Sequence, residues 1–111
     1  MRRLTGTGEH PDKLNAILFD DVASLRAARQ AEDERILDFV EALAEADFEK
    51  TLEYRTLSGT PQKQVLGDIL DHFFNHQTHH RGQGHAILTV LGVAEPDPLD
   101  LLAMLRERPI Q

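Results

Sequence analysis

Histidine is the residue type whose spacing in this chain most directly indicates chemistry. Five of the six histidines lie between positions 72 and 85. The neutral imidazole is the commonest metal ligand in proteins, and it also titrates close to neutral pH. The cluster therefore predicts either a metal site or a site of proton chemistry. Its members are His72, His76, His79, His80 and His85.

Two of these histidines, His76 and His80, fall on the apolar side of a long helix predicted at 64–92. On a helical wheel of about 100° per residue, they lie inside a stripe of apolar residues about 80° wide. Their i, i+4 spacing brings both imidazoles to one face, as in the HExxH helices that bind zinc. One divalent cation would satisfy both nitrogens, whereas two core histidines would each need a hydrogen-bond partner. Both interpretations are open at this point. The apolar residues of the stripe are Val65, Ile69, Phe73, Ile87 and Leu91.

The remaining histidines carry weaker indications of a site. His72 lies one turn before His76, at the edge of the stripe, and is a weak candidate for a third metal ligand. His79 lies at the same edge, where a hydrogen bond to solvent, to a carbonyl or to a carboxylate is the simpler expectation. His85 and Arg81 point away from the stripe, so we expect both at the surface.

The elements that must position these histidines are predicted to be helical. Apolar residues recur with helical periodicity before and within the histidine cluster, separated by a stretch that breaks this period. We therefore predict a single all-α domain over 1–111, built on a long α-hairpin. In order, its segments are an N-terminal stub and loop at 1–17, a long helix at 18–46, an extended connection or short irregular hairpin at 47–63, the histidine helix at 64–92 and a short C-terminal helix at 98–107.

The apolar stripe of the first long helix is interrupted by Arg29 and Glu32, with Asp33 at its edge. Charged groups within such a stripe are costly unless they pair with each other or with a site. An i, i+3 salt bridge is the favoured explanation, because charge runs of this kind usually form solvated faces. The weaker alternative is that Glu32 or Asp33 orients a metal-binding histidine through a hydrogen bond.

The composition narrows the classes of function. A formal net charge of −7 argues against binding to nucleic acids or to anionic membranes. The chain has no cysteine, so any metal must be held by nitrogen and oxygen ligands, and a reducing compartment is compatible with this composition. No apolar run approaches the length that crosses a bilayer, and the default expectation is a cytoplasmic protein.

The segment 75–83, Asn-His-Gln-Thr-His-His-Arg-Gly-Gln, resembles the hallmark helix of the DinB-like (DinB/YfiT) metalloproteins. The resemblance extends over nearly the whole chain. It implies a four-helix bundle and a divalent metal, most often zinc or nickel, bound by three histidines. Two of the three map onto His76 and His80. Further segments that resemble the family are 25–33, 54–59 and 98–102.

The third histidine of the family lies on an earlier helix, which has no counterpart in this chain. The resemblance implies that the N-terminal helix and most of the second helix are lacking, so that the chain is a truncated domain. Half a bundle would leave its apolar stripes in water, and we therefore expect two copies to form a homodimer that rebuilds the four helices. The remaining metal ligands would then be His72, a carboxylate, water or a residue of the second copy.

The resemblance implies a metal-dependent hydrolase or a thiol S-transferase that acts on a small molecule, and no catalytic nucleophile or base is assigned. One alternative is a non-enzymatic helical homodimer, a shortened family member with an incomplete metal site. Another is an assembly that responds to pH through the clustered imidazoles, whose pKa values lie near neutrality.

Overall fold

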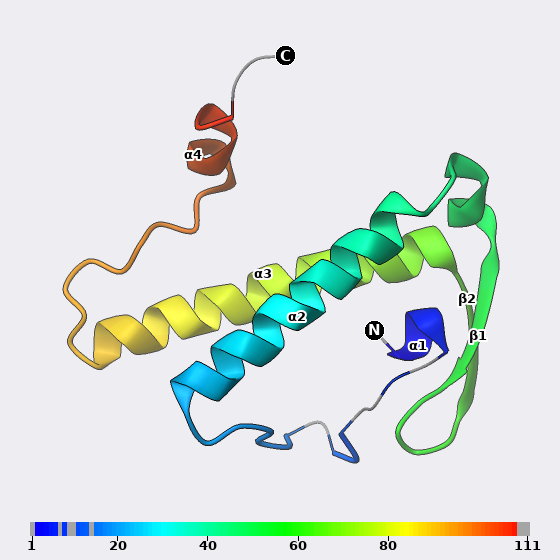
Figure 1. Ribbon diagram of the computed structural model, residues 1–111, viewed down its shortest axis with the longest axis horizontal. Coiled ribbons are helices and arrows are strands. Elements are labelled where there is room, and N and C mark those ends of the chain that lie inside the picture. Colours follow the sequence, from blue (N-terminus) through cyan, green and yellow to red (C-terminus); the bar gives the residue numbers. More distant parts are fainter. Residues whose placement is uncertain (1, 7, 9–10, 14, 109–111) are drawn as a thin grey trace. The chain divides into compact units, whose positions relative to one another are not determined.

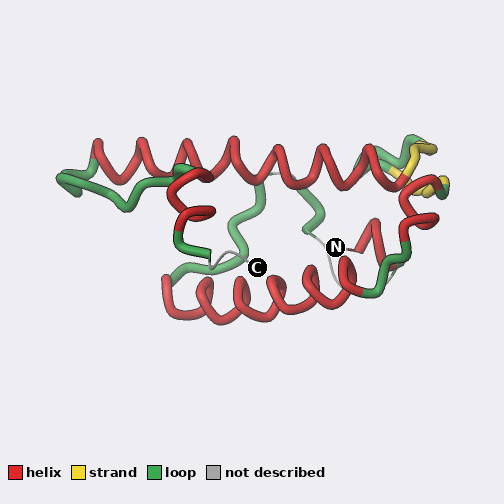
Figure 2. Tube along the Cα trace, turned by 90° about the horizontal axis from the view of Figure 1, so that it is seen from above, coloured by secondary structure: helices red, strands yellow, loops and turns green. Residues whose placement is uncertain are grey.

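The computed structural model describes residues 2–6, 8, 11–13 and 15–108. The chain divides into two compact units, Met1–Ile69 and Leu70–Gln111, and helix α3 runs across the division. The described residues are mostly helical and include one small antiparallel sheet (Figure 2). The elements labelled in Figure 1 are α1 (Arg2–Thr5), α2 (Val22–Glu41), β1 (Thr51–Arg55), β2 (Pro61–Val65), α3 (Leu66–Val90) and α4 (Leu101–Arg106), and a 3-10 helix, η1 (Glu45–Glu49), follows α2.

This architecture confirms a mostly helical chain and adds a sheet to the predicted all-α class. The added element is the β1–β2 hairpin, which forms where the sequence predicts an extended connection or short irregular hairpin at 47–63. At the N-terminus, the predicted stub and loop at 1–17 contains the single turn of α1. Residues 1, 7, 9–10 and 14 of that segment lie outside the described residues.

Helix α2 is shorter than the predicted span of 18–46 because local hydrogen bonds define both of its ends. At the start, the Asp21 carboxylate accepts hydrogen bonds from the backbone N–H and the hydroxyl of Ser24, both at 2.7 Å. These bonds, the hydroxyl bond first, lower the pKa of Asp21. After the end of α2, the Asp47 carboxylate accepts the Ala44 N–H at 2.7 Å and pairs with Lys50. Asp47 thereby stabilises η1 in place of a further turn of α2.

The hairpin is specified by its turn and by pairs of side chains across the strands. Gly59 has a φ of 85°, a conformation that glycine adopts without strain, and the Thr56 N–H donates to the Thr60 carbonyl at 2.9 Å to close the turn. Across the strands, Glu53 lies opposite Lys63 and forms an ion pair with it at 3.2 Å. The five-residue strands therefore form a regular antiparallel ladder.

Helix α3 begins directly after the hairpin and ends in a C-terminal capping motif that contains a glycine. The N–H of Leu66 donates to the carbonyl of Lys50 at 2.8 Å, which ties the first turn to the end of η1. At the other end Gly92 has a φ of 92°, and its N–H donates to the Thr89 carbonyl at 3.1 Å. Val93 completes this C-terminal motif by donating to Leu88 at 3.0 Å. The helix therefore ends within two residues of the boundary at 92 that the glycine predicts.

The short helix α4 begins later than the predicted boundary at 98. Its N-cap is Asp100, whose carboxylate accepts the backbone N–H of Leu102 at 2.8 Å.

The described part of the chain buries few apolar side chains. Leu66 and Leu70 are the buried hydrophobic residues, at 9% and 5% exposure. Close to Leu66, the backbone of Gly67 approaches Phe48 so nearly that an added Cβ would lie 3.2 Å from the Phe48 carbonyl oxygen. No helix in the described ranges is both long enough and apolar enough to cross a membrane.

We expect the substitution Leu66→Ala to reduce the free energy of unfolding by about 2–3 kcal/mol, because it removes buried apolar contacts and leaves a cavity. The matched control is Leu37→Ala on α2, where the side chain is 58% exposed and the expected loss is below about 1 kcal/mol. Urea denaturation followed by circular dichroism measures both. Equal losses in the two variants would contradict a core centred on Leu66.

Candidate metal centre

The histidine cluster lies on the part of α3 that belongs to the second compact unit. Because α3 is continuous across the cluster, residues four apart lie one turn apart on the same face. The Nε2 atoms of His76 and His80 face each other at 2.8 Å, and the two rings are nearly perpendicular, at 88° with centroids 4.4 Å apart. The structure thus brings together the two nitrogens that the sequence selects.

This spacing fits two ligands of one metal ion. Zinc–imidazole bonds are about 2.0–2.1 Å long, which places two ligand nitrogens about 2.9 Å apart at a right angle and about 3.3 Å apart in a tetrahedron. The observed 2.8 Å between the Nε2 atoms of His76 and His80 is close to these values. A small rotation of either ring would open the pair enough to admit the ion.

Gln83 supplies a supporting contact that the sequence reasoning missed. Its Oε1 atom lies 2.9 Å from Nδ1 of His80. Because an amide oxygen only accepts hydrogen bonds, Nδ1 of His80 carries the proton, and the lone pair on Nε2 of His80 accepts the Nε2–H of His76 across the 2.8 Å contact. Histidine ligands are commonly oriented in this way by an acceptor on their second nitrogen. The signal was available, since Gln83 follows His80 at the i, i+3 spacing that places side chains side by side on a helix.

The rings of His72 and His79 lie on either side of His76. Their centroids are 5.4 Å and 5.8 Å from that of His76, and both rings are within about 20° of parallel with it, at 19° and 21°. Stacked rings present faces to each other, so these two side chains contact the pair without directing a ring nitrogen at the same point. His79 is exposed, as expected, but it contacts other imidazoles and not solvent alone.

The environment of His76 favours its neutral form. Desolvation lowers the pKa of His76 below its ordinary value of 6.5, and the charges of His80, His72 and His79 lower it further, in that order. A neutral imidazole has the lone pair that a metal requires, whereas a protonated one does not. The cluster thus favours the ligand form of His76 at neutral pH.

Both members of the pair are exposed in the single chain, although the stripe predicts an inward pocket. The stripe is only partly covered in the single chain, since Phe73 before the pair is half-buried whereas Ile87 and Leu91 after it are 57% and 75% exposed. Among the residues that the structure describes, no group of three or more His, Asp or Glu side chains is arranged to hold a metal. The described part of the chain thus brings two ligand nitrogens together, those of His76 and His80. His72 as a third ligand remains a prediction.

The two carboxylates considered as supporting groups form ion pairs along α2. Asp33 accepts from Arg29 at 2.6 Å, an i, i+4 pair, and Glu32 lies 3.7 Å from Arg35, an i, i+3 pair. The predicted salt bridge of Arg29 therefore has Asp33 as a partner. Both carboxylates belong to the first compact unit, and their role beside the histidines stays a prediction.

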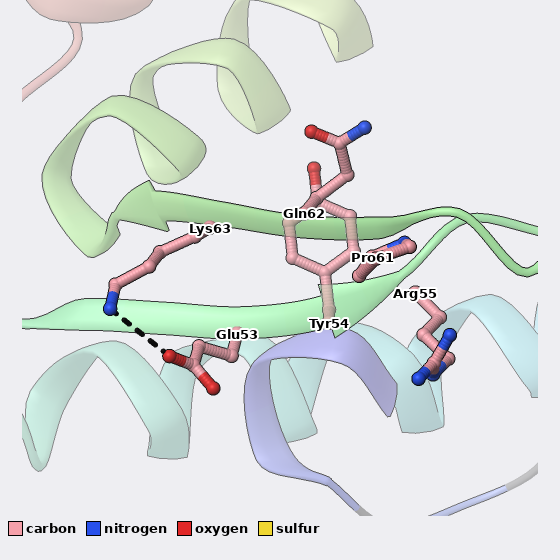
Figure 3. Close-up of a pocket in the computed structure, with 6 residues that line it drawn as sticks. All are labelled: Glu53, Tyr54, Arg55, Pro61, Gln62 and Lys63. Atoms are coloured by element: carbon pink, nitrogen blue, oxygen red, sulfur yellow. Dashed lines mark ion pairs between the residues drawn. The ribbon is translucent and has the colours of Figure 1, made fainter.

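A hollow of about 430 Å³ on the hairpin is a less suitable site. Figure 3 shows Tyr54 and Gln62 on one side of the strands, while Glu53 and Lys63 pair with each other. Arg55 donates to the carbonyl of Gly59 at 2.8 Å. Because these charged groups are occupied locally, the hollow has no cluster of groups directed at a ligand.

A second hollow, of about 560 Å³, lies beyond the cluster at the end of α3. It contains Arg81 and His85, which the sequence places at the surface, together with two carboxylates. Charges of both signs line it beside apolar groups, which gives it no distinct ligand preference. Its lining consists of Arg81, Gly84, His85, Leu88, Val93, Glu95, Pro96, Asp97 and Leu99.

Comparison with known proteins identifies the family. The sequence model of the DinB family matches residues 1–108. The match covers nearly the whole chain, and the chain therefore belongs to the DinB family. This confirms the resemblance seen at the histidine helix. Searches against curated proteins and against solved structures give no match.

The contact between Gln83 and His80 predicts the tautomer of His80. In nitrogen-15 NMR spectra of the metal-free protein, His80 should carry its proton on Nδ1, and Gln83→Ala should shift it toward the Nε2–H form because the acceptor is lost. The same substitution should weaken binding of a divalent metal about 10- to 100-fold. Gln83→Glu keeps an acceptor oxygen and is the matched control. An unchanged tautomer in Gln83→Ala would contradict this role.

Proposed function

We propose that this DinB-family chain binds a divalent metal, zinc or nickel, through Nε2 of His76 and Nε2 of His80. The observation that supports the proposal most strongly is the convergence of these two atoms to 2.8 Å on one face of α3. The lowered pKa of His76 and the contact of Gln83 with His80 support it further. The first keeps His76 neutral, and the second leaves the lone pair of His80 on Nε2, so an ion would only have to displace the proton that His76 donates to His80.

The proposed activity is that of a metal-dependent hydrolase or thiol S-transferase with a small-molecule substrate. A bound divalent ion with an open coordination position would supply Lewis-acid chemistry, by which water or a thiol becomes a better nucleophile at neutral pH. The chain's own part is to hold the ligand pair in position. Gln83 fixes the ring of His80, and the exposure of both histidines leaves their outer side accessible. The proposal assigns no nucleophile or general base.

We further propose that the functional form is a homodimer in which helices from two copies build a four-helix bundle. Large apolar side chains of α2 and α3 are exposed in the single chain, among them Val22 at 71% and Leu25 at 53%. Full burial of one such side chain contributes about 1.5–3 kcal/mol, which is substantial for a domain of this size. A second copy provides complementary apolar surface without the need for a different partner.

The same exposed apolar residues also favour a second candidate, a helical homodimer without enzymatic activity. In that case the histidines would be surface groups, and the dimer would form equally well in the presence of a chelator. Metal content separates the two candidates, because only the first requires a bound ion.

We expect tag-free protein to retain zinc or nickel through gel filtration, and His76→Ala and His80→Ala each to lose most of it. Removal of either imidazole leaves a single ligand from the pair, and one imidazole binds metal far more weakly than two. Plasma mass spectrometry of the purified proteins measures the metal, with His85→Ala as a control that removes a histidine outside the pair. Equal metal content in all four proteins would eliminate the site.

A further inference from the structure

We infer that the metal is shared by two copies of the chain and is bound by four imidazoles, those of His76 and His80 and of the partner's His76 and the partner's His80. This inference rests on the proposed metal site and identifies where the remaining ligands come from. Four nitrogen ligands complete the tetrahedral shell that zinc prefers. With all four imidazoles bound, the ion has no open coordination position and is a structural part of the dimer, so the proposed hydrolase or transferase activity would require one imidazole to give way to water or substrate.

The geometry of a single helix explains why one copy supplies two ligands. His72 and His80 are eight residues apart, which is about 12 Å along the axis of α3. To share one ion with His76, the side chains of His72 and His80 would have to lean toward each other along the axis, whereas the ring of His72 stacks on that of His76. The stacked orientation of His72 and His79 on His76 likewise leaves the facing Nε2 atoms of His76 and His80 as the convergent donors.

The histidine pair and four of the five apolar residues of the stripe are arranged symmetrically about position 78, and this arrangement points to a second copy as the occupant. In an antiparallel pairing of two α3 helices about a two-fold axis at position 78, each residue 78+n lies opposite the partner's residue 78−n. His76 then faces the partner's His80, and His80 faces the partner's His76. The two pairs of Nε2 atoms thus meet at the axis, where one ion can bind all four.

The same register places two apolar residues opposite apolar residues on each side of the metal, whereas Phe73, five positions before the centre, lies opposite the partner's Gln83. Ile87 lies nine positions after the centre and Ile69 nine positions before it, so each Ile87 opposes the partner's Ile69. Leu91 and Val65, which adjoin the two ends of α3, are related in the same way at thirteen positions. Ile87 and Leu91 are 57% and 75% exposed, and Val65 is 37% exposed, so the pairing would bury surface that is now in water.

Charge also favours an ion at this position. The stripe contains no Asp, Glu, Lys or Arg, so the symmetric contact brings no like charges together. Each chain carries a formal charge of −7, however, and two copies repel each other at long range. A divalent cation on the axis reduces this repulsion while it joins the two helices.

Titration of the tag-free, metal-free protein with zinc tests the inference. We expect calorimetry to give one zinc per two chains, and sedimentation equilibrium to show that zinc raises the dimer fraction. Ile87→Glu should reduce zinc affinity at least about tenfold, because it buries a carboxylate against the partner's Ile69 at each end of the contact and thereby removes two of four ligands. Leu88→Glu makes the same change about 100° away on the helix and should leave both measurements as in the wild type. Circular dichroism checks that both variants stay helical.

The outcomes separate this inference from the proposed function. One zinc bound per monomeric chain, abolished by His76→Ala, would overturn the shared site and leave the proposed metal binding intact. Failure of the wild-type protein to bind zinc at all would remove both. A ratio of one to two in the wild type supports the shared site even if Ile87→Glu fails to fold.

Discussion

The convergence of two imidazole nitrogens on one turn of α3 is the interaction on which the account of this protein depends. It follows from the 3.6-residue repeat of the helix, which places His76 and His80 on the same face one turn apart. Continuity of α3 across the cluster is therefore essential, because a break between these residues would separate the two nitrogens. The capping bonds at Gly92 and the tie from Leu66 to Lys50 define the ends of that helix.

The surroundings of the pair differ from those of a closed metal site within one chain. On the stripe, Phe73 next to the pair is half-buried while Ile87 and Leu91 are exposed, and the imidazoles contact each other and Gln83. Exposure of this surface to water is unfavourable because of its apolar side chains, and it also leaves two potential metal ligands without an ion. A symmetric contact between two copies would bury the apolar side chains and complete the ligand set of the metal. Metal binding and dimerisation would then depend on the same interface.

Sequence patterns could predict the long helices and the proximity of His76 to His80, because both depend on local periodicity. They could also predict the end of α3, since Gly92 is a specific local signal. The segment that forms the hairpin was predicted as an extended stretch or a short irregular hairpin. Its regular register could not be predicted, because strand pairing depends on contacts such as Glu53 with Lys63 that span ten residues. The exposure of His76 and His80 could not be derived from the sequence. An apolar stripe identifies which face of a helix requires a packing partner, but it does not identify that partner.

X-ray absorption spectroscopy of the zinc-loaded, tag-free protein tests the central claim most directly, because it identifies the ligand atoms of the bound ion. The account predicts a first shell of nitrogen at about 2.0 Å with the outer-shell scattering of imidazole rings, which is lost in His76→Ala and in His80→Ala. A shell of oxygen ligands without imidazole scattering, unchanged in these variants, would contradict it.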